Sequence, residues 1–183
     1  MKDRVIEEIK KMSGSLIGIG TDDVNFLEAI DDNNNIDLCY ILSNGGKNGK
    51  KKFKLFRGGR TKTVNIKKLS KYFRLKSIDN ILCEYGTVKR YIRSFIGESV
   101  FVCKGKTYIY GSIKDLNNLE EKYERYNCMA ELIKNNKSFL LIIDNKNSKN
   151  NIFKNFLYKI KDFFSDGADF ITDLLIIKCI KET

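Results

Sequence analysis

Leu16-Ile17-Gly18-Ile19-Gly20-Thr21-Asp22-Asp23 is an apolar run that ends in two glycines and leads into a predicted helix. Glycines in a turn between a strand and a helix let backbone N–H groups approach a ligand closely, and the helix N-terminus adds a partial positive charge. This stretch therefore predicts a strand, a turn and a helix that form one wall of a ligand-binding crevice. The rest of the fold is predicted outward from it.

Apolar residues along the rest of the chain alternate between the spacing of helices and that of strands. The predicted helices cover residues 3–12, 24–30, 67–76, 86–95, 115–135 and 152–164. The predicted strands cover residues 16–19, 36–42, 52–56, 61–66, 78–85, 139–144 and 170–180, and residues 99–103 and 107–110 form either a hairpin or one long bent strand. This alternation predicts a single α/β domain over residues 1–183 with a largely parallel sheet, in which ligands bind beyond the carboxyl ends of the strands.

The composition excludes several classes of site. The sequence has no histidine, which excludes histidine metal sites, catalytic triads and imidazole acid–base chemistry. Its five cysteines are widely spaced and lie mostly in apolar segments, so we expect buried thiols and no metal site. The longest apolar runs, 139–143 and 174–177, are far shorter than the roughly 20 residues of a membrane span, so we expect a cytoplasmic protein with no membrane contact.

Positive charge is concentrated in one segment. The chain has a net charge of +11, and residues 45–76 contain thirteen lysines and arginines and no acidic residue. Within this segment, glycines among lysines predict a mobile basic loop at about 45–62. Phosphate-binding charge interleaved with Phe53 and Phe56 favours nucleic acid, with RNA as the expected partner, and a solvated lysine-rich loop is the alternative. The predicted nucleic-acid-binding residues are Lys47, Lys50, Lys51, Lys52, Lys54, Arg57, Arg60 and Lys62.

The order of these features resembles that of class I S-adenosylmethionine-dependent methyltransferases. A helix, the G-x-G turn at Gly18 and Gly20, a second strand and then V-N-I-K-K-L-S-K-Y-F-R-L-K-S-I-D-N-I-L-C-E-Y over residues 64–85 follow one another as in that family. The resemblance implies a Rossmann-like sheet of about seven strands flanked by helices, with the last strand antiparallel, and S-adenosylmethionine as the cofactor. Two positions depart from the family's glycine-rich motif: Leu16 stands where an acidic residue usually precedes it, and Asp22 stands where a third glycine is found.

The resemblance and the predicted sheet together assign candidate site residues. The candidate cofactor-binding residues are Gly18, Gly20, Thr21, Asp22 and Asn44. Asn44 falls at the end of the second strand, where the family holds the ribose hydroxyls with an acidic residue. Glu84 and Tyr85 are the candidate catalytic residues, because amino-directed members carry there an acidic residue or Asn, two prolines and an aromatic residue. This chain has no proline to complete that motif.

Two carboxylates at the start of the predicted helix restrict the kind of ligand. Asp22 and Asp23 would repel a pyrophosphate at a helix N-terminus, which disfavours NAD and ATP, and they suit a ligand with an ammonium or sulfonium group. The alternative is that they only cap the helix, with Thr21 or Asp22 as the N-cap residue. For Glu84 the alternative is a solvated strand end.

Three functions agree with these features. The first is a small S-adenosylmethionine-binding methyltransferase-like protein that acts on RNA. The second is a non-catalytic Rossmann-like binding module that has lost its cofactor and contacts nucleic acid or protein. The third is an interaction protein that dimerises through the tyrosine-rich helix predicted over 115–135, for which an exposed apolar stripe would be the sign.

Overall fold

The computed structural model describes residues 1–43, 51–55, 61–64, 66–116, 119–124, 126–146 and 148. The described residues form eight strands, which are β1 (Gly14–Ile19), β2 (Ile36–Ser43), β3 (Lys51–Leu55), β4 (Thr61–Val64), β5 (Ile78–Glu84), β6 (Cys103–Ser112), β7 (Met129–Lys134) and β8 (Ser138–Asp144). Their α-helices are α1 (Lys2–Lys11), α2 (Val24–Asp31), α3 (Tyr85–Val88), α4 (Ile92–Val102) and α5 (Leu119–Glu124). Their 3-10 helices are η1 (Ile66–Lys71), η2 (Lys89–Tyr91) and η3 (Ile113–Asp115).

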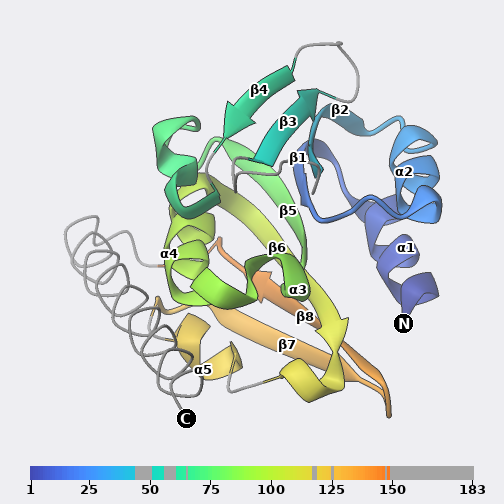
Figure 1. The fold of residues 1–183 in the computed structure, drawn as a ribbon, viewed down its shortest axis with the longest axis vertical. Coiled ribbons are helices and arrows are strands. Elements are labelled where there is room, and N and C mark those ends of the chain that lie inside the picture. The colour runs from blue at the N-terminus through green and yellow to red at the C-terminus, as the bar shows by residue number, and fades with distance from the viewer. Residues whose placement is uncertain are drawn as a thin grey trace, which may run out of the picture.

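All eight strands belong to one sheet, in the order β4-β3-β2-β1-β5-β6-β8-β7 (Figure 1). The four central strands β2, β1, β5 and β6 are parallel neighbours. Strands β3 and β8 run antiparallel to both of their neighbours, so six of the eight described strands point the same way. This arrangement confirms the Rossmann-like α/β fold and the mostly parallel sheet. The last described strand along the chain, β8, is antiparallel, and the strand predicted over 170–180 lies outside the described residues.

Helices cover both faces of the sheet. Figure 1 shows α1 and α2 on one side and α3, α4 and α5 on the other. Side chains alternate along the strands accordingly: Leu82 of β5 packs with the α1 and α2 residues, whereas Ile81 and Cys83 pack with those of α4 and α5. Strand β8, between β6 and β7, is almost continuously apolar and its middle residues are buried, as expected for a strand that is covered on both faces.

Residues 115–135 do not form the long helix that their apolar spacing predicts. Among the described residues of this stretch only α5 is α-helical, Asn127 has a positive φ of 57°, and β7 pairs with β8. Hydrogen bonding to a neighbouring strand therefore outweighs helical spacing beyond residue 127. Tyr123 is fully buried, with its hydroxyl 3.2 Å from the Ser99 hydroxyl, so the predicted helix and its exposed dimerisation stripe are wrong.

Two other predicted elements differ from the structure. Residues 99–102 continue helix α4, and β6 is one long strand with no hairpin at Gly105. The helix predicted over 67–76 is the shorter η1, which contains a non-helical residue at Lys68. In both cases tertiary packing outweighs local preference.

Strands β3 and β4 confirm the short strands predicted at 52–56 and 61–66, and they pair with each other. The rest of the predicted loop over 45–62, and the helix predicted over 152–164, lie outside the described residues. The prediction of buried cysteines is confirmed for Cys39, Cys83, Cys103 and Cys128, which are free thiols. Over the described ranges, no helix is long and apolar enough to cross a membrane.

Candidate functional site

The sheet reverses its winding direction between β1 and β5. The chain leaves β1 through α2 to form β2 on one side, and it leaves β5 through α3 and α4 to form β6 on the other. The carboxyl ends of two such strands diverge, so a crevice forms there in open α/β sheets. The sequence predicted the ligand site at this edge.

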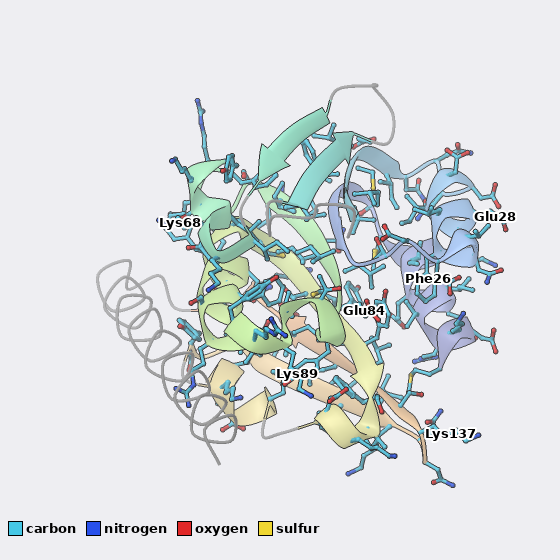
Figure 2. All side chains as sticks on the ribbon, in the orientation of Figure 1. Phe26, Glu28, Lys68, Glu84, Lys89 and Lys137 are labelled. Atoms are coloured by element: carbon cyan, nitrogen blue, oxygen red, sulfur yellow. The ribbon has the colours of Figure 1, made fainter. Side chains whose placement is uncertain are left out.

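A cavity of about 590 Å³ opens at this crevice. Its volume lies within the range of small-molecule sites, about 300 to 1,000 Å³. Figure 2 shows Phe26 from α2 and Glu84 from β5 near each other at this end of the sheet. The residues that line the cavity are Met1, Lys2, Val5, Gly20, Asp22, Asp23, Phe26, Glu84, Tyr110, Gly111, Ser112 and Ser138.

Gly20 shapes the turn that bounds the cavity. Its φ of +67° lies in the left-handed region, which glycine adopts without steric cost. A Cβ atom at this position would lie 2.2 Å from Oγ1 of Thr87 and 3.0 Å from Oε2 of Glu84. Gly20 was predicted to let the backbone approach a ligand closely. In the structure, the absence of a side chain at Gly20 also lets the turn pack against Glu84 of β5 and Thr87 of α3.

Asp23 is the N-cap of α2, where the sequence predicted Thr21 or Asp22. Its carboxylate accepts a hydrogen bond from the backbone N–H of Asn25 at 3.1 Å and forms an ion pair with Lys2 of α1. The hydrogen bond from Lys2 is the main cause that lowers the pKa of Asp23 below its usual value. Asp22, one residue earlier, is exposed and lines the cavity, and it is not the N-cap residue.

Glu84 and Tyr110 form the opposite wall. The Thr87 hydroxyl donates to Oε2 of Glu84 at 3.1 Å, which holds that half-buried carboxylate at the end of β5. The Tyr110 hydroxyl donates to the carbonyl oxygen of Gly20 at 3.2 Å, and its ring meets Phe26 edge to face at 5.3 Å. Burial, followed by the negative charge of Glu84, raises the pKa of Tyr110. Tyr110 is therefore a neutral hydrogen-bond donor and an apolar wall.

The structure brings together only part of the predicted site. Gly20, Asp22 and Glu84 line the cavity, whereas Gly18 and Thr21 are buried behind the turn. No described residue forms a hydrogen bond with the Thr21 hydroxyl. Tyr85, predicted to face the acceptor, is 3% exposed and packs edge to face on Phe139, because α3 begins at this residue and turns its ring into the core.

The remaining predicted residues fall in or near the undescribed segments. Asn44, Lys47, Lys50, Arg57 and Arg60 lie outside the described residues. Lys51, Lys52 and Lys54 are on β3, and Lys62 is on β4. These four basic residues therefore occupy two paired strands at the end of the sheet.

Sequence reasoning missed the contributions of α1 and β6. Lys2 lies 21 residues before Asp23 in the sequence, and no local pattern links them. Tyr110 lies in the strand predicted at 107–110 and was not a candidate site residue, but its position at the carboxyl end of β6 brings it to the cavity. Only the strand order could have revealed these neighbours.

The cavity is acidic although the chain is basic. Its lining side chains include three carboxylates, Asp22, Asp23 and Glu84, and one lysine, Lys2, which pairs with Asp23. Such a site attracts cations and repels phosphate groups. Neither these three carboxylates nor any other group of carboxylates or thiols in the described part of the chain is arranged to hold a metal ion.

No protein-family model and no curated protein matches this sequence. Among solved structures, the chain is similar to a methyltransferase from Pyrococcus furiosus, with a TM-score of 0.42 and 15% sequence identity over 79% of this chain and 81% of that one. The function proposed below rests on the residues of the cavity.

Proposed function

We propose that this protein binds S-adenosylmethionine in the cavity between β1 and β5 and acts as a methyltransferase. The observation that supports this most strongly is the acidic lining at the reversal point of the sheet. The cofactor carries an ammonium and a sulfonium group, and both suit the carboxylates of Asp22 and Glu84. The ring pair of Phe26 and Tyr110 offers an apolar wall beside them.

The residues of the cavity fit separate tasks in this proposal. Gly20 and Asp22 lie on the turn and would hold the amino-acid part of the cofactor, and Asn44, which lies outside the described residues, would hold its ribose hydroxyls. The cofactor supplies a methyl group that its sulfonium charge already activates. Glu84, which Thr87 holds in place, would take up the proton that the acceptor atom releases. Orientation of the two substrates would supply most of the rate enhancement.

Calorimetric titration with S-adenosylmethionine and with its demethylated product tests this proposal. We expect Asp22→Asn and Glu84→Gln each to raise the Kd for the cofactor about tenfold, equivalent to about 1.4 kcal/mol. The product keeps the ammonium group but has lost the sulfonium charge, so Asp22→Asn should raise both Kd values alike, whereas Glu84→Gln should raise that of the product less. An unequal effect of Glu84→Gln on the two ligands would place its carboxylate near the sulfonium.

Glu28→Gln is the matched control. Glu28 is an exposed carboxylate on α2 that does not line the cavity, and Figure 2 shows it on the outer side of that helix. Its substitution should leave both affinities unchanged. Absence of heat at millimolar S-adenosylmethionine would refute the proposal and would favour the non-catalytic binding module that has lost its cofactor.

We also propose RNA as the partner of the β3–β4 hairpin, whose two paired strands carry Lys51, Lys52, Lys54 and Lys62. Binding of a fluorescent single-stranded RNA should weaken steeply between 50 and 200 mM salt, with a slope of about 0.7 per phosphate contact in a log–log plot. Replacing the four lysines by glutamine should flatten that slope. The same change at Lys10, Lys114, Lys134 and Lys137 should have little effect, and a flat salt dependence in the unmodified protein would refute RNA binding at the hairpin.

A further inference from the structure

The charge of the acidic cavity between β1 and β5 restricts which molecule can receive the methyl group. Its charged side chains are three carboxylates and one lysine, which sum to −2. S-adenosylmethionine has one carboxylate against its ammonium and sulfonium groups, so the cavity would stay negative with the cofactor bound. We propose that the acceptor is a small primary amine, which binds in its ammonium form beside Glu84. The transfer of the methyl group rests on the function proposed above.

Glu84 is the carboxylate that faces the acceptor. Asp23 already accepts a hydrogen bond from the Lys2 ammonium and caps α2, so an alkylammonium group fits against this wall of the cavity. The proposed function assigns Asp22 to the ammonium group of the cofactor. Glu84 lies on the opposite wall, where the Thr87 hydroxyl donates to its Oε2. A carboxylate has about four acceptor positions, so Glu84 can also accept from an amine.

Two aromatic rings complete this part of the cavity. Phe26 and Tyr110 line it and meet edge to face at 5.3 Å. The Tyr110 hydroxyl donates to the carbonyl oxygen of Gly20, and a Cβ atom on Gly20 would lie 3.0 Å from Oε2 of Glu84, so the ring and the carboxylate border the same turn. Aromatic rings attract ammonium groups and also pack on the carbon atoms of an amine.

The same features disfavour RNA as the acceptor. A negative cavity repels the phosphate groups that surround every base of RNA. The lysines proposed to bind RNA lie on β3 and β4, which β2 separates from β1. The acceptor must also share a cavity of about 590 Å³ with the cofactor, which favours a small molecule. RNA would then bind at the hairpin without receiving the methyl group in this cavity.

The transfer step begins with loss of a proton. The bound ammonium releases one proton to Glu84 and from there to water, and the neutral nitrogen then carries a lone pair. This nitrogen attacks the methyl carbon, and the new N–C bond forms as the C–S bond breaks. The electron pair of the broken bond stays on sulfur, which becomes a neutral thioether. The products are a methylated ammonium, the demethylated cofactor and one proton.

Calorimetric titration of the full chain with phenethylamine and with 2-phenylethanol tests the charge requirement, because a hydroxyl replaces the ammonium in the second ligand. We expect the amine to bind at least about tenfold more tightly, and Glu84→Gln to raise its Kd about tenfold without changing that of the alcohol. Lys2→Met leaves the cavity more negative and should lower the amine Kd about threefold. Tighter binding cannot result from a folding defect, so this variant keeps the test decisive if Glu84→Gln fails to fold.

Methyl transfer is then followed with S-adenosylmethionine labelled in its methyl group. We expect label in phenethylamine, at a rate that rises with pH toward about 10, where primary amines lose their proton. Glu28→Gln, on the outer side of α2, should change neither binding nor transfer. Label in RNA and none in the amine would overturn this inference, as would equal binding of amine and alcohol by a protein that binds S-adenosylmethionine. Selective amine binding without S-adenosylmethionine binding would instead overturn the proposed cofactor.

Discussion

Gly20→Ala is expected to destabilise the protein by about 2 to 3 kcal/mol and to abolish ligand binding in the acidic cavity. An alanine at a φ of +67° costs about 1 to 2 kcal/mol, because its Cβ crowds the following carbonyl oxygen. The same Cβ would lie 2.2 Å from the Thr87 hydroxyl and 3.0 Å from the Glu84 carboxylate, so these two groups must move. Their mutual hydrogen bond positions Glu84, and the cavity wall is expected to change with it. Urea unfolding and calorimetric titration with S-adenosylmethionine measure the two effects.

Two further variants separate the cost of the left-handed backbone at residue 20 from the cost of the steric clash between the new Cβ atom and Thr87. Gly86→Ala makes the same change two residues after Glu84, where the nearest atom to the new Cβ is 3.9 Å away, so it should leave stability and affinity nearly unchanged. The double variant Gly20→Ala with Thr87→Ala removes the hydroxyl that clashes and should recover part of the stability. If Gly20→Ala unfolds at the same urea concentration as the unmodified protein, the turn does not need a left-handed residue.

The first half of the fold could be predicted from the sequence because its signals are local. The apolar run before Gly20 and the asparagine-rich break before Ile36 mark β1, α2 and β2 within a few residues of their observed ends. The alternation of strands and helices predicted a largely parallel sheet with its ligand site at the carboxyl ends of the strands, and the strand order came from the family resemblance, so the edge that holds the cavity was predicted as well. Gly20, Asp22 and Glu84 were found in this way.

The second half could not be predicted because pairing between strands determines it. Residues 129–134 follow helical spacing from Tyr126, yet they form β7 because β8 offers a partner through a short turn. The strand predicted at 139–144 belonged to a sheet expected to be largely parallel, and the sequence has no signal for the antiparallel direction of β8. Tyr85 shows the same limit in the site. One residue after Glu84 the backbone enters α3, and the side chain turns from the cavity edge into the core.

Lys76→Met is expected to lower the free energy of unfolding by about 3 kcal/mol. The Lys76 ammonium donates to the carbonyl oxygens of Cys103 and Asn145 at 3.0 and 3.2 Å, and to the Ser148 hydroxyl at 2.7 Å. It therefore joins the turn before β5 to the start of β6 and to the residues after β8. Methionine has a similar length but leaves all three acceptors without this donor. Lys104→Met, which removes one exposed ion pair with Asp79, should cost less than about 1 kcal/mol.

The pH dependence of this loss distinguishes a buried ammonium from a surface one. Burial lowers the pKa of Lys76 in the folded protein below the 10.5 of an ordinary lysine. The neighbouring thiols of Cys103 and Cys128 would oppose this effect only as thiolates, and burial raises both of their pKa values, that of Cys128 to about 11. Between the lowered pKa and 10.5 the unfolded chain binds more protons than the folded one, so the contribution of Lys76 to stability increases with pH.

The stability difference between the unmodified protein and Lys76→Met should therefore widen as the pH rises from 7.5 toward 10.5. Urea unfolding of both proteins across this range measures it, and taking the difference removes the titration of the tyrosines, which both proteins share. A constant difference between the unmodified protein and Lys76→Met would mean that Lys76 holds its proton as firmly in the folded state as in water, and that its three hydrogen bonds fully compensate for burial.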